Sequence, residues 1–161
     1  GACRSIGINR NDVMTLIQMR PEGEPIQWLA FASNAFNVLV PFYATIDTTP
    51  DYFSSTTREV TTDSFYWVSR MIGAMADASY SKSIFHIERY QERVMSKGHE
   101  YINQYDELLS KESDAEKRMQ LRQEANEKIA DMVKKETQDT LNKVLYELSN
   151  QMKNAYSRSD A

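Results

Sequence analysis

The chain holds one cysteine, Cys3, which is the residue whose chemistry would be simplest to recognise. A cysteine at a free amino terminus acts as a nucleophile while its own α-amino group serves as the base. The neighbouring Arg4 would favour the thiolate form. Nothing else nearby completes such a site, so the local sequence favours a small, half-buried residue near the start of a strand. One cysteine also excludes an internal disulfide framework.

The two histidines, His86 and His99, are the residues most suited to bind a metal ion. They lie thirteen positions apart in a segment with helical periodicity. On a helix they would be about 140° apart around the axis and nearly 20 Å apart along it. They cannot share one metal ion, so we predict surface or capping histidines, no metal site and no cofactor.

Small and amide residues interrupt an apolar stretch at positions 33–37, which read SNAFN. The amide of Asn34 could donate to an oxyanion or hold a peptide backbone, with Phe36 closing the wall of a pocket. Alternatively, these residues form a bulge or turn that satisfies its own backbone. The residue types alone favour the turn.

The composition restricts the class of protein. The chain has 161 residues, of which 41% are hydrophobic and 26% charged, as in a globular domain. A net charge of −4 argues against nucleic acid as a partner. No apolar run approaches the roughly 20 residues that span a bilayer, so no membrane is expected. With a single cysteine and no signal peptide, we expect a cytoplasmic protein. The start without methionine indicates a tag remnant or a piece of a longer protein.

Short apolar runs in the first 60 residues predict a β-rich segment. Residues 13–19 and 26–32 resemble strands, and Pro21, Gly23 and Pro25 supply the turn between them. Two further strands are predicted at 5–9 and 36–40. Strands 13–19 and 26–32 carry apolar residues on both faces, so both faces should be covered.

A helical segment is predicted over residues 61–161. Thr62 is the expected N-cap of a helix over 63–78, and a second helix should cover 83–109. Ser113 and Glu116 resemble a capping box that begins a third helix, which should continue to about 156. The short connection predicts that the two long helices pack antiparallel. Their apolar stripes comprise Ile87, Tyr90, Val94, Tyr101, Tyr105 and Leu108 on the second helix, and Ile129, Met132, Val133, Leu141, Val144, Leu145, Leu148 and Met152 on the third.

These elements predict an α+β fold, with a few antiparallel strands at 1–60 followed by three helices at 61–161, as one structural unit. One-sided helices cannot cover both faces of the strands. The missing cover should come from another segment of a larger protein or from a tight homo-oligomer.

Several segments resemble one known family in both their residues and their order along the chain. They are residues 4–11 (RSIGINRN), 16–21 (LIQMRP), 27–37 (QWLAFASNAFN), 40–43 (VPFY), 62–67 (TDSFYW) and 87–91 (IERYQ). Together they are similar to the C-terminal region of the C69 family dipeptidases. The stretch from 27 to 43 is the most specific part, and the last helix matches in character alone.

The resemblance implies the C-terminal portion of an αββα N-terminal-nucleophile hydrolase that cleaves dipeptides. In that family the nucleophile is an N-terminal cysteine, on a segment far upstream of this region. No catalytic residue is therefore assigned here, Cys3 included, and this fragment alone should be inactive. Arg4, Arg20 and Arg70 all remain conceivable as a catalytic arginine. The substrate-pocket candidates are Asn34, Phe36 and Arg4.

The partners implied are a dipeptide substrate and the missing N-terminal part of the same protein. The long amphipathic helices also allow a second hypothesis, a non-catalytic helical interaction or oligomerisation module.

Overall fold

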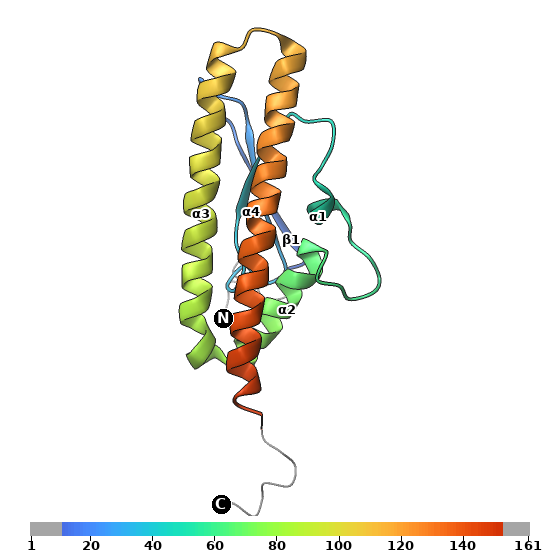
Figure 1. Ribbon diagram of the computed structural model, residues 1–161, viewed down its shortest axis with the longest axis vertical. Helices are drawn as coiled ribbons and strands as arrows, with labels where there is room; N and C mark the ends of the chain where they lie inside the picture. Colours follow the sequence, from blue (N-terminus) through green and yellow to red (C-terminus); the bar gives the residue numbers. More distant parts are fainter. Residues whose placement is uncertain (1–10, 153–161) are drawn as a thin grey trace, which may run out of the picture.

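The computed structural model describes residues 11–152 as a small sheet beside a long helical hairpin (Figure 1). The strands are β1 (Val13–Gln18), β2 (Ile26–Phe31) and β3 (Val40–Tyr43). The helices are α1 (Asp51–Ser54), α2 (Phe65–Ala78), α3 (Tyr80–Lys111) and α4 (Ala115–Ser149). The predicted strand at 5–9 lies outside the described residues. An antiparallel sheet followed by helices confirms the α+β class.

The sheet is an antiparallel meander in the order β1-β2-β3. Val13 pairs with Phe31 and Gln18 with Ile26, while Leu29 pairs with Val40 in the next ladder. The strands predicted at 13–19 and 26–32 are confirmed, each ending one residue earlier than expected. Their apolar and β-branched residues were a sufficient signal.

The strand predicted at 36–40 is wrong, because β3 occupies Val40–Tyr43. The backbone N–H of Phe36 donates to the carbonyl of Ser33 at 3.2 Å, which closes a turn where a strand was expected. Pro41 lies within β3 although it has no N–H to donate. It is tolerated because β3 is the last strand of the described sheet, so one of its edges pairs with no strand.

The helix boundaries differ from the predictions at both ends. The third helix was expected to continue to about 156, but α4 ends at Ser149. Ser64, rather than Thr62, precedes α2, and α3 begins at Tyr80. The predicted capping box is wrong by one residue. Asp114 is the N-cap of α4, and its carboxylate accepts from the backbone N–H of Lys117 at 2.9 Å. The one-turn helix α1 was not predicted, because four residues are too few to show a helical period.

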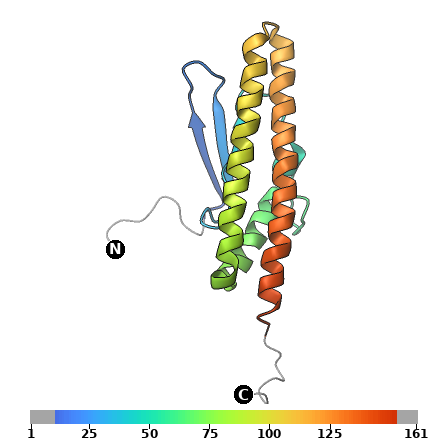
Figure 2. The same ribbon diagram turned by 60° about the vertical axis from the view of Figure 1, so that its left-hand side comes forward.

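The antiparallel packing of the two long helices is confirmed (Figures 1 and 2). Glu136 of α4 accepts from Arg93 and Lys97 of α3 at 2.6 and 2.7 Å. Three of the residues predicted on the apolar stripes are instead exposed, namely Leu108, Leu145 and Met152. The core uses Ile102 and Leu109 of α3, because the contact face drifts around so long a helix.

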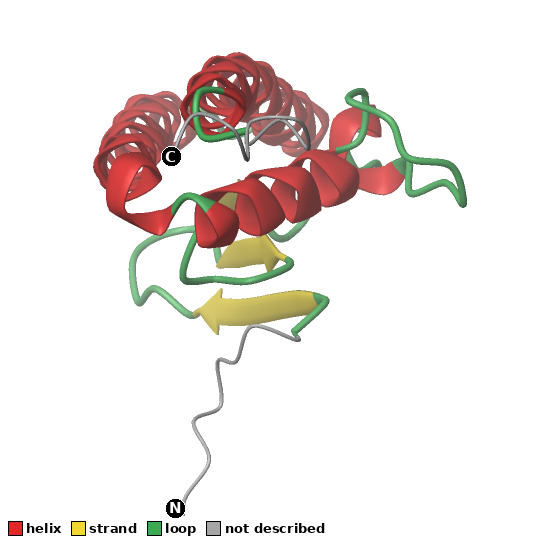
Figure 3. Ribbon diagram, turned by 90° about the horizontal axis from the view of Figure 1, so that it is seen from below, coloured by secondary structure: helices red, strands yellow, loops and turns green. Residues whose placement is uncertain are grey.

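The sheet projects away from the helices, with β3 innermost and β1 outermost (Figures 2 and 3). All four residues of β3 are buried, since the strand packs against α3 and α4. Among the described elements, β1 packs against β2 alone. Its Val13, Leu16 and Ile17 are 54%, 49% and 57% exposed. Residues 11–152 therefore do not supply the predicted cover for the faces of β1, whereas β2 packs against α2.

Gly98 allows β3 to approach α3 closely, which gives a stability prediction. A Cβ at position 98 would lie 2.8 Å from Cγ of Pro41, inside any normal contact distance. We expect Gly98→Ala to lower the free energy of unfolding by about 1–3 kcal/mol through overpacking. In the control Gly73→Ala, the nearest atoms would be at 3.7 and 3.9 Å. That variant should be neutral or more stable by up to about 1 kcal/mol, as expected for glycine in a helix. Urea denaturation of both would show whether the contact with Pro41 matters.

Candidate functional site

The loop after β2 has an unusual backbone. Ala32 adopts a φ of 57° and is the one non-glycine residue within 11–152 with positive φ. This left-handed conformation is unfavourable for a residue with a Cβ and often occurs at functional positions. The N–H of Ala32 donates to the carbonyl of Asp12 at 2.9 Å, which holds the start of the loop against the chain before β1.

The amide of Asn37 fixes the other end of this loop. Its Nδ2 donates to the carbonyls of Ser33 and Ser69 at 2.9 and 3.0 Å, joining the loop to α2. Gln91 of α3 donates to the carbonyl of Asn37 at 2.9 Å. Two helices therefore hold the loop, and its shape is defined by buried hydrogen bonds rather than by its own sequence alone.

Three buried oxygens around this loop lack a hydrogen-bond partner within residues 11–152. They are Oγ of Ser33, Oγ of Ser69 and Oδ1 of Asn37. Buried polar groups are nearly always paired in native proteins, because desolvation without a hydrogen bond is unfavourable. Such a cluster marks a place where water or a ligand group would be stabilised.

Two small cavities flank the loop. The Arg70 cavity has a volume of about 190 Å³, and its lining includes Ala32, Ser33, Phe36, Arg70, Gly73 and Asp77. The Met14 cavity has a volume of about 260 Å³, and its lining includes Met14, Asn34, Asn37, Gln91 and Met95.

The structure places the predicted pocket residues Asn34 and Phe36 on different sides of the loop. Phe36 lines the Arg70 cavity, whereas Asn34 lines the Met14 cavity, where its Nδ2 lies 4.0 Å from the sulfur of Met14. The third candidate, Arg4, lies outside the described residues, as does Cys3. Within 11–152, no cluster of three or more His, Cys, Asp or Glu could hold a metal ion.

The two histidines take part in separate contacts along α3. His86 lies 3.5 Å from a carboxylate oxygen of Glu147 on α4. His99 packs its ring 5.3 Å from that of Trp28 on β2. Both contacts join α3 to a neighbouring element. None of the described helices is long and apolar enough to cross a bilayer.

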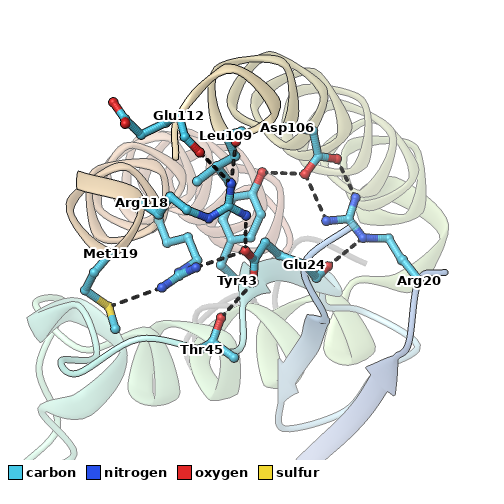
Figure 4. Close-up of polar contacts among 10 residues, drawn as sticks. Arg20, Glu24, Tyr43, Thr45, Asp106, Leu109, Glu112, Arg118 and Met119 are labelled. Carbon is cyan, nitrogen blue, oxygen red and sulfur yellow. Dashed lines mark hydrogen bonds and ion pairs between the residues drawn. The ribbon is translucent and has the colours of Figure 1, made fainter. Parts of the chain in front are cut away.

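A second polar cluster joins the turn between β1 and β2 to the tip of the helical hairpin (Figure 4). Arg20 forms a two-pronged ion pair with Asp106 of α3, which also accepts from the hydroxyl of Tyr43 at 2.9 Å. Burial and the contact with Asp106 raise the pKa of Tyr43. Arg20, one of the three arginines considered for catalysis, is thus engaged in positioning the sheet.

Glu24 forms the other half of this cluster. It accepts from Arg118 at 2.5 Å and from Arg122 at 3.0 Å, both on α4. Burial favours the neutral acid, but the two guanidinium groups outweigh it and lower the pKa of Glu24. The paired charges indicate that this cluster holds the β1–β2 turn against the helical hairpin and is not a reactive site.

The sequence indicated the stretch 33–37 but did not distinguish Ser33 or Asn37 as pocket residues, and Gln91 and Asp77 were not predicted. Asn37 is in the same short motif as Asn34, and nothing in the local sequence distinguishes the two amides. The sequence did contain a signal for Arg70 and Asp77. Their spacing of seven positions places both on one face of a helix.

The chain resembles known peptidases. The model of "Peptidase family C69" matches residues 1–93. Most of the chain is covered by that match, and the chain therefore belongs to peptidase family C69.

Curated relatives extend the match over almost the whole chain. A "Probable dipeptidase A" of Streptococcus pyogenes serotype M3 (strain SSI-1) is 41% identical over 163 residues, covering 98% of this chain and 34% of the relative. A "Dipeptidase" of Bifidobacterium longum (strain NCC 2705) is 33% identical over 98% of the chain and 37% of the relative. "Dipeptidase A" of Lactobacillus helveticus is 28% identical over 89% of the chain and 31% of the relative. The chain spans about a third of the length of these relatives.

Proposed function

We propose that this chain is the C-terminal part of a dipeptidase whose nucleophile, an N-terminal cysteine, lies on a segment outside these 161 residues. The observation that carries the proposal is the 41% identity over 98% of the chain to a relative named as a probable dipeptidase, of which it covers 34%. The reaction is hydrolysis of a dipeptide: the α-amino group takes the proton of the thiol, the sulfur attacks the peptide carbonyl, the C–N bond breaks to release the C-terminal amino acid, and water then hydrolyses the thioester. We propose a cytoplasmic location for the complete enzyme.

The partner proposed for this chain is the rest of the same enzyme. β1 exposes apolar side chains on both faces, because Val13 and Ile17 alternate with Leu16 along the strand. A strand with two apolar faces is typical of the interior of a layered sheet. The remaining segment would cover these faces, and without it the chain should self-associate as a homo-oligomer.

Hydrolysis assays test whether the nucleophile lies outside this 161-residue chain. We expect the purified 161-residue chain to hydrolyse no dipeptide, because it lacks the nucleophile, and Cys3→Ser to change nothing measurable. A longer polypeptide that includes the upstream cysteine should hydrolyse dipeptides and lose activity when that cysteine is replaced by serine. Robust turnover by the 161-residue chain that disappears in Cys3→Ser would contradict the proposal.

We further propose that loop 33–37 forms part of the substrate-pocket wall, with Asn34, Phe36 and Arg4 as contributors. In the longer enzyme, we expect Asn34→Ala to raise KM with kcat nearly unchanged, by loss of an amide that positions the substrate or the loop. A fall in kcat of about 10²-fold would instead assign the amide to oxyanion stabilisation.

The matched control for this variant is Asn103→Ala, an exposed amide on α3. It should keep parent kinetics and a parent melting temperature. If Asn34→Ala also keeps parent kinetics, Asn34 has no role in the pocket. A lower melting temperature with parent kinetics would make it a turn residue.

A further inference from the structure

The Arg70 cavity has opposite charges at its two ends. Arg70 and Asp77 are both exposed residues of α2, seven positions apart, so they share one face of the helix. About 10 Å of helix axis separates them. Gly73 lies between them, and its missing side chain leaves open the space next to Ser33, whose Cβ would be 3.9 Å from a Cβ at position 73.

The polar groups around this cavity retain binding capacity. Asp77 has no hydrogen-bond or ion-pair partner among the described residues. Arg70 pairs with Asp12 at 2.8 Å and donates to the hydroxyl of Tyr66 at 3.3 Å, and the side chains of Arg70 and Asp12 are 46% and 70% exposed. Exposed pairs of this kind are weak, and a guanidinium has five donors. Arg70 can therefore also bind an incoming anion.

The loop side of the cavity adds two independent signs of a ligand site. Ser33 lines the cavity with 9% of its surface exposed, and its hydroxyl has no partner in the part of the chain that the structure describes. The residue before it, Ala32, is held in the unfavourable left-handed conformation. Backbone of this kind persists where the surrounding structure requires it, and it is common at ligand sites.

The dimensions restrict the ligand to a small molecule. A volume of about 190 Å³ is below the range of pockets for drug-sized ligands. Two extended residues span at most about 7 Å, which is shorter than the roughly 10 Å of helix axis between positions 70 and 77. A ligand with an ammonium group at one end and a carboxylate at the other matches both charges.

We propose that the Arg70 cavity binds the charged ends of a dipeptide, with Asp77 accepting from the ammonium group and Arg70 donating to the carboxylate. The choice of a dipeptide as the ligand rests on the proposed dipeptidase function. The positions of the two charges are observed independently of that function. Ser33 and Gly73 form the wall of the cavity beside the middle of the ligand. Asn34, on the other side of the loop, affects this ligand only by positioning the turn.

Titrations followed by ¹⁵N-resolved NMR on the 161-residue chain test this inference. The probes are Ala-Ala, its N-acetylated form and its C-terminal amide. We expect Ala-Ala to shift the backbone signals of Ser33, Gly73 and Ala74. Each capped form should bind about tenfold or more weakly, because it lacks one charge-assisted contact.

Variants then assign each end of the ligand. Asp77→Asn should bind Ala-Ala and its N-acetylated form equally, while still discriminating against the amide. Arg70→Gln should show the opposite pattern. The matched controls are Glu88→Gln and Arg58→Gln, exposed charges elsewhere on the chain that should preserve both preferences.

Three outcomes would overturn the inference. They are no shifts at up to about 100 mM peptide, a concentration far above that of weak binding; equal binding of free and capped peptides by the parent chain; and retention of both preferences in Asp77→Asn and Arg70→Gln. Binding is measured here without hydrolysis. Binding by this chain with no hydrolysis by the longer polypeptide would contradict the proposed function alone, and hydrolysis without binding would contradict this inference alone.

Discussion

Replacing Asn126 with alanine is expected to lower the free energy of unfolding by about 2–6 kcal/mol. Its side-chain Oδ1 accepts from the backbone N–H of Tyr43 at 2.9 Å, and its Nδ2 donates to the carbonyl of Tyr43 at 3.1 Å. Asn126 thus replaces a neighbouring strand at the inner edge of β3. Both residues are buried, so alanine would leave two backbone groups unpaired, at about 1–3 kcal/mol each.

Urea denaturation and amide hydrogen exchange at Tyr43 would measure this effect. The matched control is Gln123→Ala, on the same helix, whose amide donates to Thr48 at an exposed position at 3.3 Å. The control should stay within about 0.5 kcal/mol of the parent, as surface substitutions usually do. A similar small loss for Asn126→Ala would show that water or another group satisfies Tyr43.

Leu141→Pro is expected to lower the free energy of unfolding by about 3 kcal/mol or more. Leu141 lies well inside α4 and is buried. Proline at that position removes a helical hydrogen bond and clashes with the preceding turn. The part of α4 that packs on α3 beyond this point should separate, which circular dichroism and a melting curve would detect.

Ala115→Pro is the control for this variant, because Ala115 is the first residue of α4 and is exposed. Proline is well tolerated at the first helical position, and the preceding Asp114 already has the extended backbone that proline favours. Ala115→Pro should melt like the parent. If Leu141→Pro also melted like the parent, this result would contradict the packing of α4 described above.

The sequence by itself determined the elements that hydrophobic periodicity specifies. Short apolar runs defined β1 and β2 to within a residue, and the helical period identified Ile87, Tyr90 and Val94 as buried residues of α3. The short connection between the long helices was enough to predict their antiparallel packing. Those features depend on interactions between residues near in sequence, which is why composition and spacing reveal them. The same is true of the family, whose motifs are continuous segments.

Tertiary structure decided the features that depend on distant partners. Asn34 and Asn37 are two amides in one motif, but only Asn37 bonds to Ser69 of α2 while Gln91 of α3 holds its carbonyl. Phe36 was expected in a strand and lies in a turn that these helices hold. Ser33 and Asp77 line one cavity only because the fold packs the loop after β2 against α2. Local sequence cannot rank such residues, because their hydrogen bonds and their burial are set by segments 30 to 80 positions away in the chain.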